Sequence, residues 1–412
     1  MRRSPSWLRL GIALVAVALA AALVASATAG RFPLWLRSSA EASPSASRSA
    51  PSHPAPSPGA TSTPEPSRSS APAPALSLQQ LAGQRVIFSY GGLRPPASLL
   101  NLIRHGEAAG VIFFSQNVSS DAQIAKVIAE LEQANASPTN PVRKPLLLMT
   151  DQEGGQIRRL PGPPLLSERQ IATSSSPAAA AANAGTTGGQ YLRGLGLNVD
   201  LAPVLDVYRR AGDFDDQFQR SYSMDPAVVS ELGAGFITAL QAQGVAATAK
   251  HFPGLGTAAQ PEDTDLRPVT LKVPLATIRD TDEVPYKAAI AAGVRLVLVS
   301  WAVYPALDPG RPAGLSPTIV NGELRQRLGF KGVTITDALE AGALRSFGSF
   351  QNRSLLAAEA GMDLILCSQQ NVSEGEQAMT GLENGYRDGQ LAKPAFDAAL
   401  DRVLALRSSL GQ

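Results

Sequence analysis

Residues 246–254 read Ala-Ala-Thr-Ala-Lys-His-Phe-Pro-Gly, a short run of small residues that ends in a lysine and a histidine. The run at 246–249 does not alternate polar with apolar residues, which is typical of a β-strand buried on both faces. Seven more runs of this kind occur along the chain, at 86–88, 111–114, 146–150, 197–201, 296–300, 333–336 and 362–366. Longer stretches with helical spacing separate them, for example 121–134, 226–240 and 322–328.

Eight strands with intervening helices, in the 337 residues from Leu76 onward, predict an α/β fold of the (β/α)₈ TIM-barrel type. A doubly wound open sheet is the alternative that the same alternation allows. The chain shows no repeat of 20–50 residues, so a solenoid is excluded.

The amino-acid composition limits the kinds of functional site that the chain can contain. The 412 residues are 44% hydrophobic and 17% charged, enough apolar residues for a large core. The single cysteine, Cys367, excludes a disulfide within the chain and a cysteine-built metal site, and the three histidines are widely spaced. The composition therefore gives no sign of a metal centre built from cysteine or histidine. Residues 1–75 hold seven arginines and two acidic residues, so the other 337 have 29 basic and 32 acidic residues and no basic patch for nucleic acid.

The N-terminal region predicts export. Arg2, Arg3 and Arg9 precede residues 10–29, which are uncharged and largely apolar. This pattern indicates a signal peptide, with Ala27-Thr28-Ala29 as a cleavage site, or a retained membrane anchor, within residues 1–37. Residues 38–75, of which 30 are Ser, Pro or Ala, predict a disordered linker. A barrel over 76–412 is then expected outside the cytoplasm, secreted or held at the membrane, as a monomer.

Polar residues follow several of the predicted strands. Barrel active sites lie at the carboxyl ends of the strands, so these residues are the candidates for function. They include Asp151 to Arg159, Asp206, Lys250-His251 and Asp337. Taken singly, an aspartate at a strand end is an ordinary helix cap, and Lys250 also suits a Schiff-base aldolase. Their coincidence on one rim instead predicts a site for a polyhydroxylated ligand.

The chain resembles a known family, the N-terminal (β/α)₈ domain of glycoside hydrolase family 3, in its branch of single-domain bacterial β-N-acetylglucosaminidases (β-N-acetylhexosaminidases). The resemblance is strongest in the blocks Asp-Gln-Glu-Gly-Gly at 151–155 and Lys-His-Phe-Pro-Gly at 250–254. Further similar blocks occur in the family's order at 110–114, 198–207, 220–222, 304–308 and 328–337.

The resemblance implies roles for particular residues. Asp337 would be the nucleophile of a retaining double displacement, which needs no cofactor. The residues that would hold the sugar are Asp151, Arg159, Arg220, Lys250 and His251. Since the aldolase alternative does not fit a lysine inside this motif, a carbohydrate is the expected partner.

One departure from the family concerns the general acid/base. In the branch it resembles, the loop after Lys-His-Phe-Pro-Gly ends in Asp-Ser-His, and that histidine is the acid/base. Here Leu255 replaces an earlier histidine of the loop, and Asp265 stands where the acid/base would be. A carboxylate of this loop, from Asp265, Asp263 or Glu262, is therefore expected to protonate the leaving group.

Two functions follow from these observations. The first is an exported exo-β-glycosidase that releases N-acetylglucosamine from cell-wall glycan, including peptidoglycan fragments, or from related β-glycosides. The second is a catalytically impaired, wall-associated barrel that binds sugar, which the missing histidine favours. The presence of Asp337 favours the enzyme, because a binding protein needs no nucleophile.

Overall fold

The computed structural model describes residues 76–410. Eight parallel strands form a single sheet in the order β11-β8-β7-β6-β3-β2-β1-β12. Their bounds are β1 Val86–Phe88, β2 Gly110–Phe113, β3 Leu147–Thr150, β6 Val199–Asp200, β7 Ala246–Phe252, β8 Leu296–Val299, β11 Val333–Thr336 and β12 Ile365–Leu366.

The sheet closes on itself. β12 pairs with β1 in parallel register, Val86 opposite Ile365, and a parallel bridge between Ile335 and Leu364 joins β11 to the start of β12. This closure confirms the predicted (β/α)₈ barrel, and the open doubly wound sheet is wrong because such a sheet leaves two unpaired edges.

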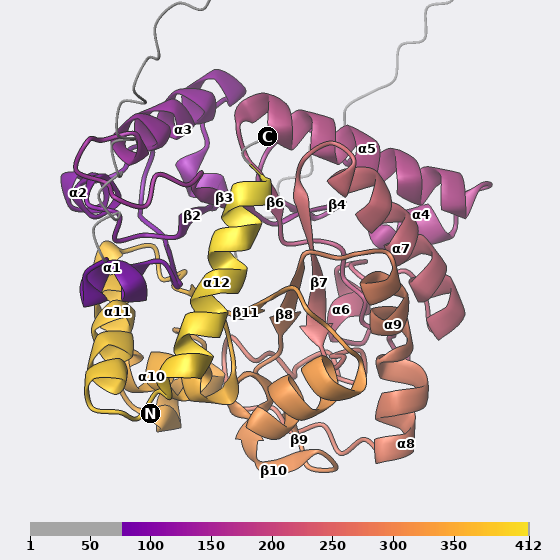
Figure 1. The fold of residues 1–412 in the computed structure, drawn as a ribbon. Helices are drawn as coiled ribbons and strands as arrows, with labels where there is room; N and C mark the ends of the chain where they lie inside the picture. Colours follow the sequence, from indigo (N-terminus) through magenta and orange to yellow (C-terminus); the bar gives the residue numbers. More distant parts are fainter. Residues whose placement is uncertain (1–75, 411–412) are drawn as a thin grey trace, which may run out of the picture. The chain divides into compact units, whose positions relative to one another are not determined.

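The helices surround the strands (Figure 1), and neighbours α5, α7 and α9 pack side by side along one side of the barrel. The α-helices are α1 Leu78–Gly83, α2 Ala97–Arg104, α3 Asp121–Asn135, α4 Glu168–Ala172, α5 Pro177–Leu195, α6 Phe214–Gln217, α7 Pro226–Gln241, α8 Leu275–Thr277, α9 Val284–Ala291, α10 Phe350–Ala360, α11 Val372–Arg387 and α12 Lys393–Ser409. Two π-helical segments, Ile278–Asp282 and Thr318–Arg327, and 3₁₀ turns at Ser115–Asn117, Ala313–Leu315 and Gly342–Phe347 complete the set.

The predicted helices at 121–134 and 226–240 are confirmed as α3 and α7, each capped at its first turn by a side-chain oxygen, from Ser120 and Asp225. The segment predicted at 322–328 is helical but begins earlier, at Thr318. All eight predicted strands occur. The bounds differ at β12, which begins only at Ile365, and at β7, which continues through Lys250 and His251 to Phe252.

Two apolar layers hold the barrel together. Residues between strands and helices form the larger core, and a second cluster fills the barrel interior with alternate residues of the strands, such as Met149, Leu298 and Ile335. At the amino ends of the strands, α12 closes this interior with Val403 and Leu406. The loops that follow the strands lie at the opposite, carboxyl end of the barrel.

Those loops include two small hairpins, β4 Gln152–Gly154 with β5 Ile157–Arg158 and β9 Val303–Tyr304 with β10 Asp308–Pro312. Asp151 therefore precedes a hairpin rather than a helix, and Asp337 precedes a turn and the 3₁₀ segment, so neither residue is an α-helix cap.

No helix within residues 76–410 combines the length and apolarity needed to cross a bilayer. The predicted signal or anchor at 1–37 and the predicted linker at 38–75 lie outside the described residues.

Candidate active site

A cavity of about 360 Å³ opens at the carboxyl end of the barrel, within the size range of small-molecule sites, roughly 300–1,000 Å³. Its floor is apolar and consists of the last inward-facing residues of the strands, Ile112, Leu201, Leu298 and Leu366. The residues to which the sequence analysis gave a catalytic or sugar-binding role line it, apart from Glu262, namely Asp151, Arg159, Arg220, Lys250, His251, Asp263, Asp265 and Asp337. Glu262, the third acidic residue of the loop, is not part of the lining.

One part of the lining is a network of opposite charges, which we call the paired cluster: Asp151, Glu153, Arg159, Arg220 and Lys250. Lys250 Nζ lies 2.8 Å from Asp151 Oδ1 and 2.8 Å from Glu153 Oε1. Arg220 binds Glu153 with two parallel hydrogen bonds of 2.9 and 2.8 Å. Arg159 Nε lies 3.5 Å from Asp151 Oδ2. Each charge in this cluster is thus compensated by another.

The pairing fixes the charge states of the cluster. Burial alone would raise the pKa of Asp151, but the positive charges of Lys250 and Arg159 outweigh it and hold that pKa far below its usual range. Burial likewise opposes the charge on Lys250, yet Asp151 and Glu153 raise its pKa overall. These groups stay ionised throughout the neutral range, as suits hydrogen bonding to sugar hydroxyls.

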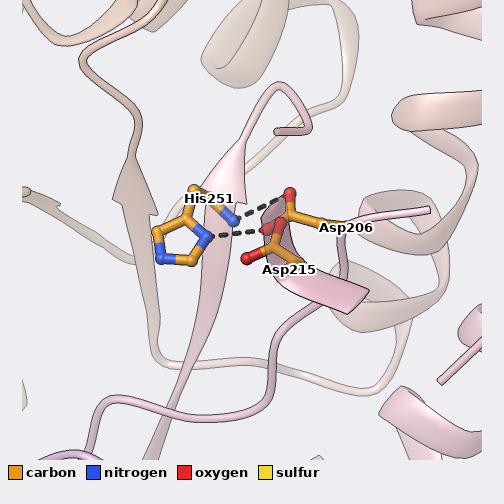
Figure 2. A group of neighbouring side chains, drawn as sticks. All are labelled: Asp206, Asp215 and His251. Carbon is orange, nitrogen blue, oxygen red and sulfur yellow. Dashed lines mark hydrogen bonds and ion pairs between the residues drawn. The ribbon is translucent and has the colours of Figure 1, made fainter. Parts of the chain in front are cut away.

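His251 is oriented by a buried aspartate. Its Nδ1 lies 2.7 Å from Asp206 Oδ2, and its backbone N–H donates to Asp206 Oδ1 at 3.3 Å (Figure 2). Burial, with Arg220 nearby, lowers the pKa of His251 to about 4, so the ring is neutral. Nδ1 must carry the ring proton to bond Asp206, which leaves Nε2 as an acceptor toward the cavity.

Asp206, Asp215 and His251 are also a geometric candidate for a metal site, since one ligand atom from each lies within 4.8 Å of the others (Figure 2). The Arg220 guanidinium lies 3.3 Å from Asp215 Oδ1 and 3.4 Å from His251 Nε2. A fixed positive charge in contact with two of the three ligands opposes a divalent cation. We interpret the group as support for the His251 ring.

The remaining charged side chains of the lining are acidic, and we call them the acidic cluster: Asp263, Asp265, Asp337 and Glu340. Across residues 76–410 none of its carboxylates has an ion-pair partner. Asp337 Oδ1 accepts the backbone N–H of Ala338 at 2.8 Å, and Glu340 Oε1 accepts the hydroxyl of Ser368 at 2.8 Å.

Two pKa values in this cluster are shifted upward. The Asp265 side chain is exposed at the cavity mouth, yet the partial loss of water around its carboxyl and the charges of Asp337, Asp263 and Glu340 raise its pKa to about 7. Burial also raises the pKa of Asp337, but His251, the Ala338 N–H and Lys250 all favour its ionised form. Both carboxyls are therefore protonated more readily than an exposed aspartate, and the groups that favour the ionised form act more on Asp337 than on Asp265.

Glu153 and Asp206 stand among the strand-end candidates of the sequence, but the sequence did not predict their role as supports of other side chains. Glu153 holds both Lys250 and Arg220, and Asp206 holds His251, although both stand inside the blocks 151–155 and 198–207 that carried the resemblance. Their partners lie on other strands, and a single sequence gives no sign of that pairing.

Comparison with known proteins identifies relatives along the whole barrel. The family described as "Glycosyl hydrolase family 3 N terminal domain" matches residues 76–406. An uncharacterized secreted glycosyl hydrolase of Arthroderma benhamiae is 45% identical over 81% of this chain and 94% of its own length. A β-hexosaminidase of Xanthomonas oryzae pv. oryzae is 33% identical over 72% of this chain and 87% of its own length.

Solved structures show the same relationship. A family 3 β-N-acetylglucosaminidase from Paenibacillus sp. superposes with a TM-score of 0.76 at 34% identity, covering 82% of this chain but only 64% of that longer chain. The β-N-acetylhexosaminidase from Beutenbergia cavernae superposes with a TM-score of 0.73 at 32% identity, over 81% of this chain and 99% of that one.

Proposed function

The chain belongs to glycoside hydrolase family 3, and from that membership we propose that it is an exported, retaining exo-β-N-acetylglucosaminidase with Asp337 as nucleophile and Asp265 as general acid/base. The observation that carries the proposal is that two carboxyl groups with different charge environments line one cavity. A retaining glycosidase needs one ionised and one protonated carboxyl at the pH where it works.

Asp337 suits the nucleophile. Its carboxylate accepts the Ala338 N–H and lies in the favourable potential of the Lys250 charge, both of which stabilise negative charge. In the first step an Asp337 oxygen bonds to the anomeric carbon as the bond from that carbon to the glycosidic oxygen breaks.

Asp265 suits the acid. With a pKa of about 7 it still carries a proton near neutral pH, and it gives that proton to the departing oxygen. In the second step the Asp265 carboxylate takes a proton from water, the water oxygen bonds to the anomeric carbon, and the bond to Asp337 breaks. Two inversions leave the sugar with its original configuration.

The paired cluster supports recognition of a sugar. Its carboxylates accept hydrogen bonds from hydroxyl groups, while Arg159 and Lys250 donate them. The side chains that reach the cavity most openly are Arg159, 32% exposed, and Asp151, 14% exposed. The closed apolar floor beneath them supports binding of one terminal sugar unit rather than the middle of a chain.

N-acetylglucosamine is proposed because the relatives named for an activity are β-hexosaminidases or β-N-acetylglucosaminidases. Export is proposed from the apolar segment at 10–29 and from the name of the secreted Arthroderma relative. A wall glycan, including peptidoglycan fragments, is the proposed natural substrate, and a monomer the proposed state.

The test is a panel of aryl β-glycosides, with the anomeric configuration of the first product followed by NMR. The expected result is preference for the β-N-acetylglucosaminide and release of the β-anomer, absent in Asp337→Ala. Release of the α-anomer would contradict the retaining mechanism. Tight sugar binding with no turnover of any substrate would favour the alternative, an impaired sugar-binding barrel.

A further inference from the structure

The segment after β7, residues 253–267, crosses the mouth of the cavity and carries Asp263 and Asp265. Its first half is tied to the β6 side of the barrel. The Leu255 N–H donates to Asp206 Oδ1 at 2.6 Å, and the Phe214 N–H donates to the carbonyl of Ala258 at 3.0 Å. The Gly254 carbonyl also accepts the hydroxyl of Tyr304 at 2.8 Å.

The second half of the segment is tied to the residues just beyond Asp337. The Gly342 N–H donates to the carbonyl of Asp265 at 2.7 Å, and the Ala343 N–H donates to the carbonyl of Thr264 at 3.0 Å. Thr264 is only 5% exposed, so this contact is inside the protein. The same short turn that follows Asp337 therefore holds the backbone of Asp265.

The contact leaves no room for a side chain at position 342. A Cβ placed on Gly342 would lie 2.2 Å from the carbonyl oxygen and 2.3 Å from the carbonyl carbon of Leu266, and 2.9 Å from the Arg267 nitrogen. All three are backbone atoms, and real Cβ contacts essentially never fall below 3.0 Å. The φ of Gly342 is not in the left-handed region, so close approach, rather than backbone conformation, requires glycine.

We propose that Gly342 is a positioning residue, the docking point that fixes the Asp265 carboxyl relative to Asp337 before substrate arrives. The proposal rests on the proposed function, in which Asp265 is the acid/base. Adding a methyl group at 342 must move the loop backbone by about 0.8 Å, the difference between the 2.2 Å contact and 3.0 Å. A shift of about 1 Å in a catalytic group costs on the order of 10²-fold in rate.

The experiment compares Gly342→Ala with Gly235→Ala, a matched control on α7 where a Cβ would meet no atom within 4 Å. Turnover is measured on two aryl β-N-acetylglucosaminides, one with a good and one with a poor leaving group. Gly342→Ala is expected to lose about 10²-fold in kcat on the poor leaving group and far less on the good one. Azide should restore turnover of the good one, and Gly235→Ala should behave as the unchanged protein.

A purely structural role for Gly342 predicts equal losses on both substrates without azide rescue, and that result would overturn the proposal, as would full activity. Binding of N-acetylglucosamine and the Tm show whether Gly342→Ala is folded. If it is not, Ala343→Pro provides a second variant: it replaces the N–H that donates to Thr264 by a ring carbon, displaces the same loop from a different atom, and must show the same dependence on leaving group.

Asp265→Ala, measured in parallel, separates this inference from the proposed function. If Asp265→Ala shows no dependence on leaving group, the acid/base assignment itself fails. If Asp265→Ala shows it and neither Gly342→Ala nor Ala343→Pro does, only the docking role fails.

Discussion

The paired cluster and the acidic cluster line the same cavity, yet they are built on opposite principles. In the paired cluster every charge has a partner, and Lys250 lies 2.8 Å from each of two carboxylates. In the acidic cluster the carboxylates have only hydrogen-bond donors and one another. Compensated charges keep a fixed protonation state, whereas Asp265, which has no positive partner among the described residues, has a pKa raised to about 7. In the proposed function, the paired cluster binds the sugar and the acidic cluster carries out the reaction.

The largest effect is expected at Asp337. Replacing it by alanine removes the covalent route, so kcat should fall by several orders of magnitude while the barrel stays folded. A fluorinated slow substrate should label a peptide containing Asp337, detected by mass spectrometry. Labelling of a residue in the paired cluster would contradict the assignment of catalysis to the acidic cluster.

Asp265→Ala is expected to lose about 10²–10⁴-fold on a substrate with a poor leaving group. The loss on an activated aryl glycoside should be much smaller, and azide should restore it. Asp263→Ala should lose less on the poor leaving group and need no azide, because Asp263 accepts the Asp265 N–H at 2.8 Å and raises the pKa of Asp265 without giving the proton itself. Comparable losses for Asp265→Ala on both substrates would leave Asp265 without the acid/base role.

A carboxylate acid/base also predicts the acceptor. A negative Asp265 repels phosphate as that anion approaches the glycosyl-enzyme, while water is unaffected. Added phosphate should therefore give no acceleration and no sugar phosphate, measured by ³¹P NMR. Phosphorolysis would require a neutral base, so that result would contradict a carboxylate of the acidic cluster as the acid/base.

Within the paired cluster, Glu153→Gln should act mainly on stability. It leaves the buried charges of Arg220 and Lys250 undercompensated, at a cost of about 3–5 kcal/mol in the free energy of unfolding. The pKa of Glu153 is lowered in the folded protein, because Arg220 and Lys250 outweigh burial. Its contribution is thus complete above the pKa of an exposed glutamate, about 4.3, and is lost as the pH falls below it.

Denaturant unfolding at pH 7 and pH 3.5 measures this effect. The exposed Glu231 of α7 gives the control, since Glu231→Gln should change stability by no more than about 0.5 kcal/mol. An equally small change in Glu153→Gln would mean that the pairing does not support the barrel.

The pH dependence of kcat/KM should follow the acidic cluster. The acid must be protonated, and the pKa of Asp265 is raised to about 7, so activity on a poor leaving group should fall as the pH rises through about 7, by about tenfold per unit. Asp265→Ala should lose this alkaline limb. If the loss of activity at high pH persists in Asp265→Ala, another group causes it and Asp265 is not the acid.

The smallest expected effect is at Glu340, which raises the pKa of Asp265 less than burial, Asp337 and Asp263 do. Glu340→Gln removes one negative charge, so the alkaline limb should move to lower pH by a fraction of a unit while the acid limb stays nearly unchanged. A shift to higher pH would contradict the assigned electrostatics.

Much of the fold was predictable because each barrel strand is buried on both faces and so appears as an unalternated apolar run. The carboxyl end of β7 was not, because Lys250 and His251 look like loop residues although they continue the strand into the cavity. Lys250 pairs with Asp151, and His251 pairs with Asp206. Because of these pairs, polar side chains can be buried at the end of a strand without a large desolvation cost.

The site was predictable only where a residue and its motif are local. Asp151, Lys250 and Asp337 stand at strand ends in recognisable blocks, and the cavity contains all three. The partners Glu153 and Asp206, and the tight contact at Gly342, depend on distances between distant segments. A single sequence contains no such distances.

The way the barrel closes has a consequence for its biogenesis. β1, at residues 86–88, finds its second neighbour only in β12, at residues 365–366. Until that late segment has been synthesised, one side of β1 is an unpaired edge, open to pairing with other chains. Such non-local pairing makes folding slow and the nascent chain prone to aggregation. Productive folding must therefore wait until nearly the whole chain has emerged, and a chaperone that shields the β1 edge should raise the yield of native protein.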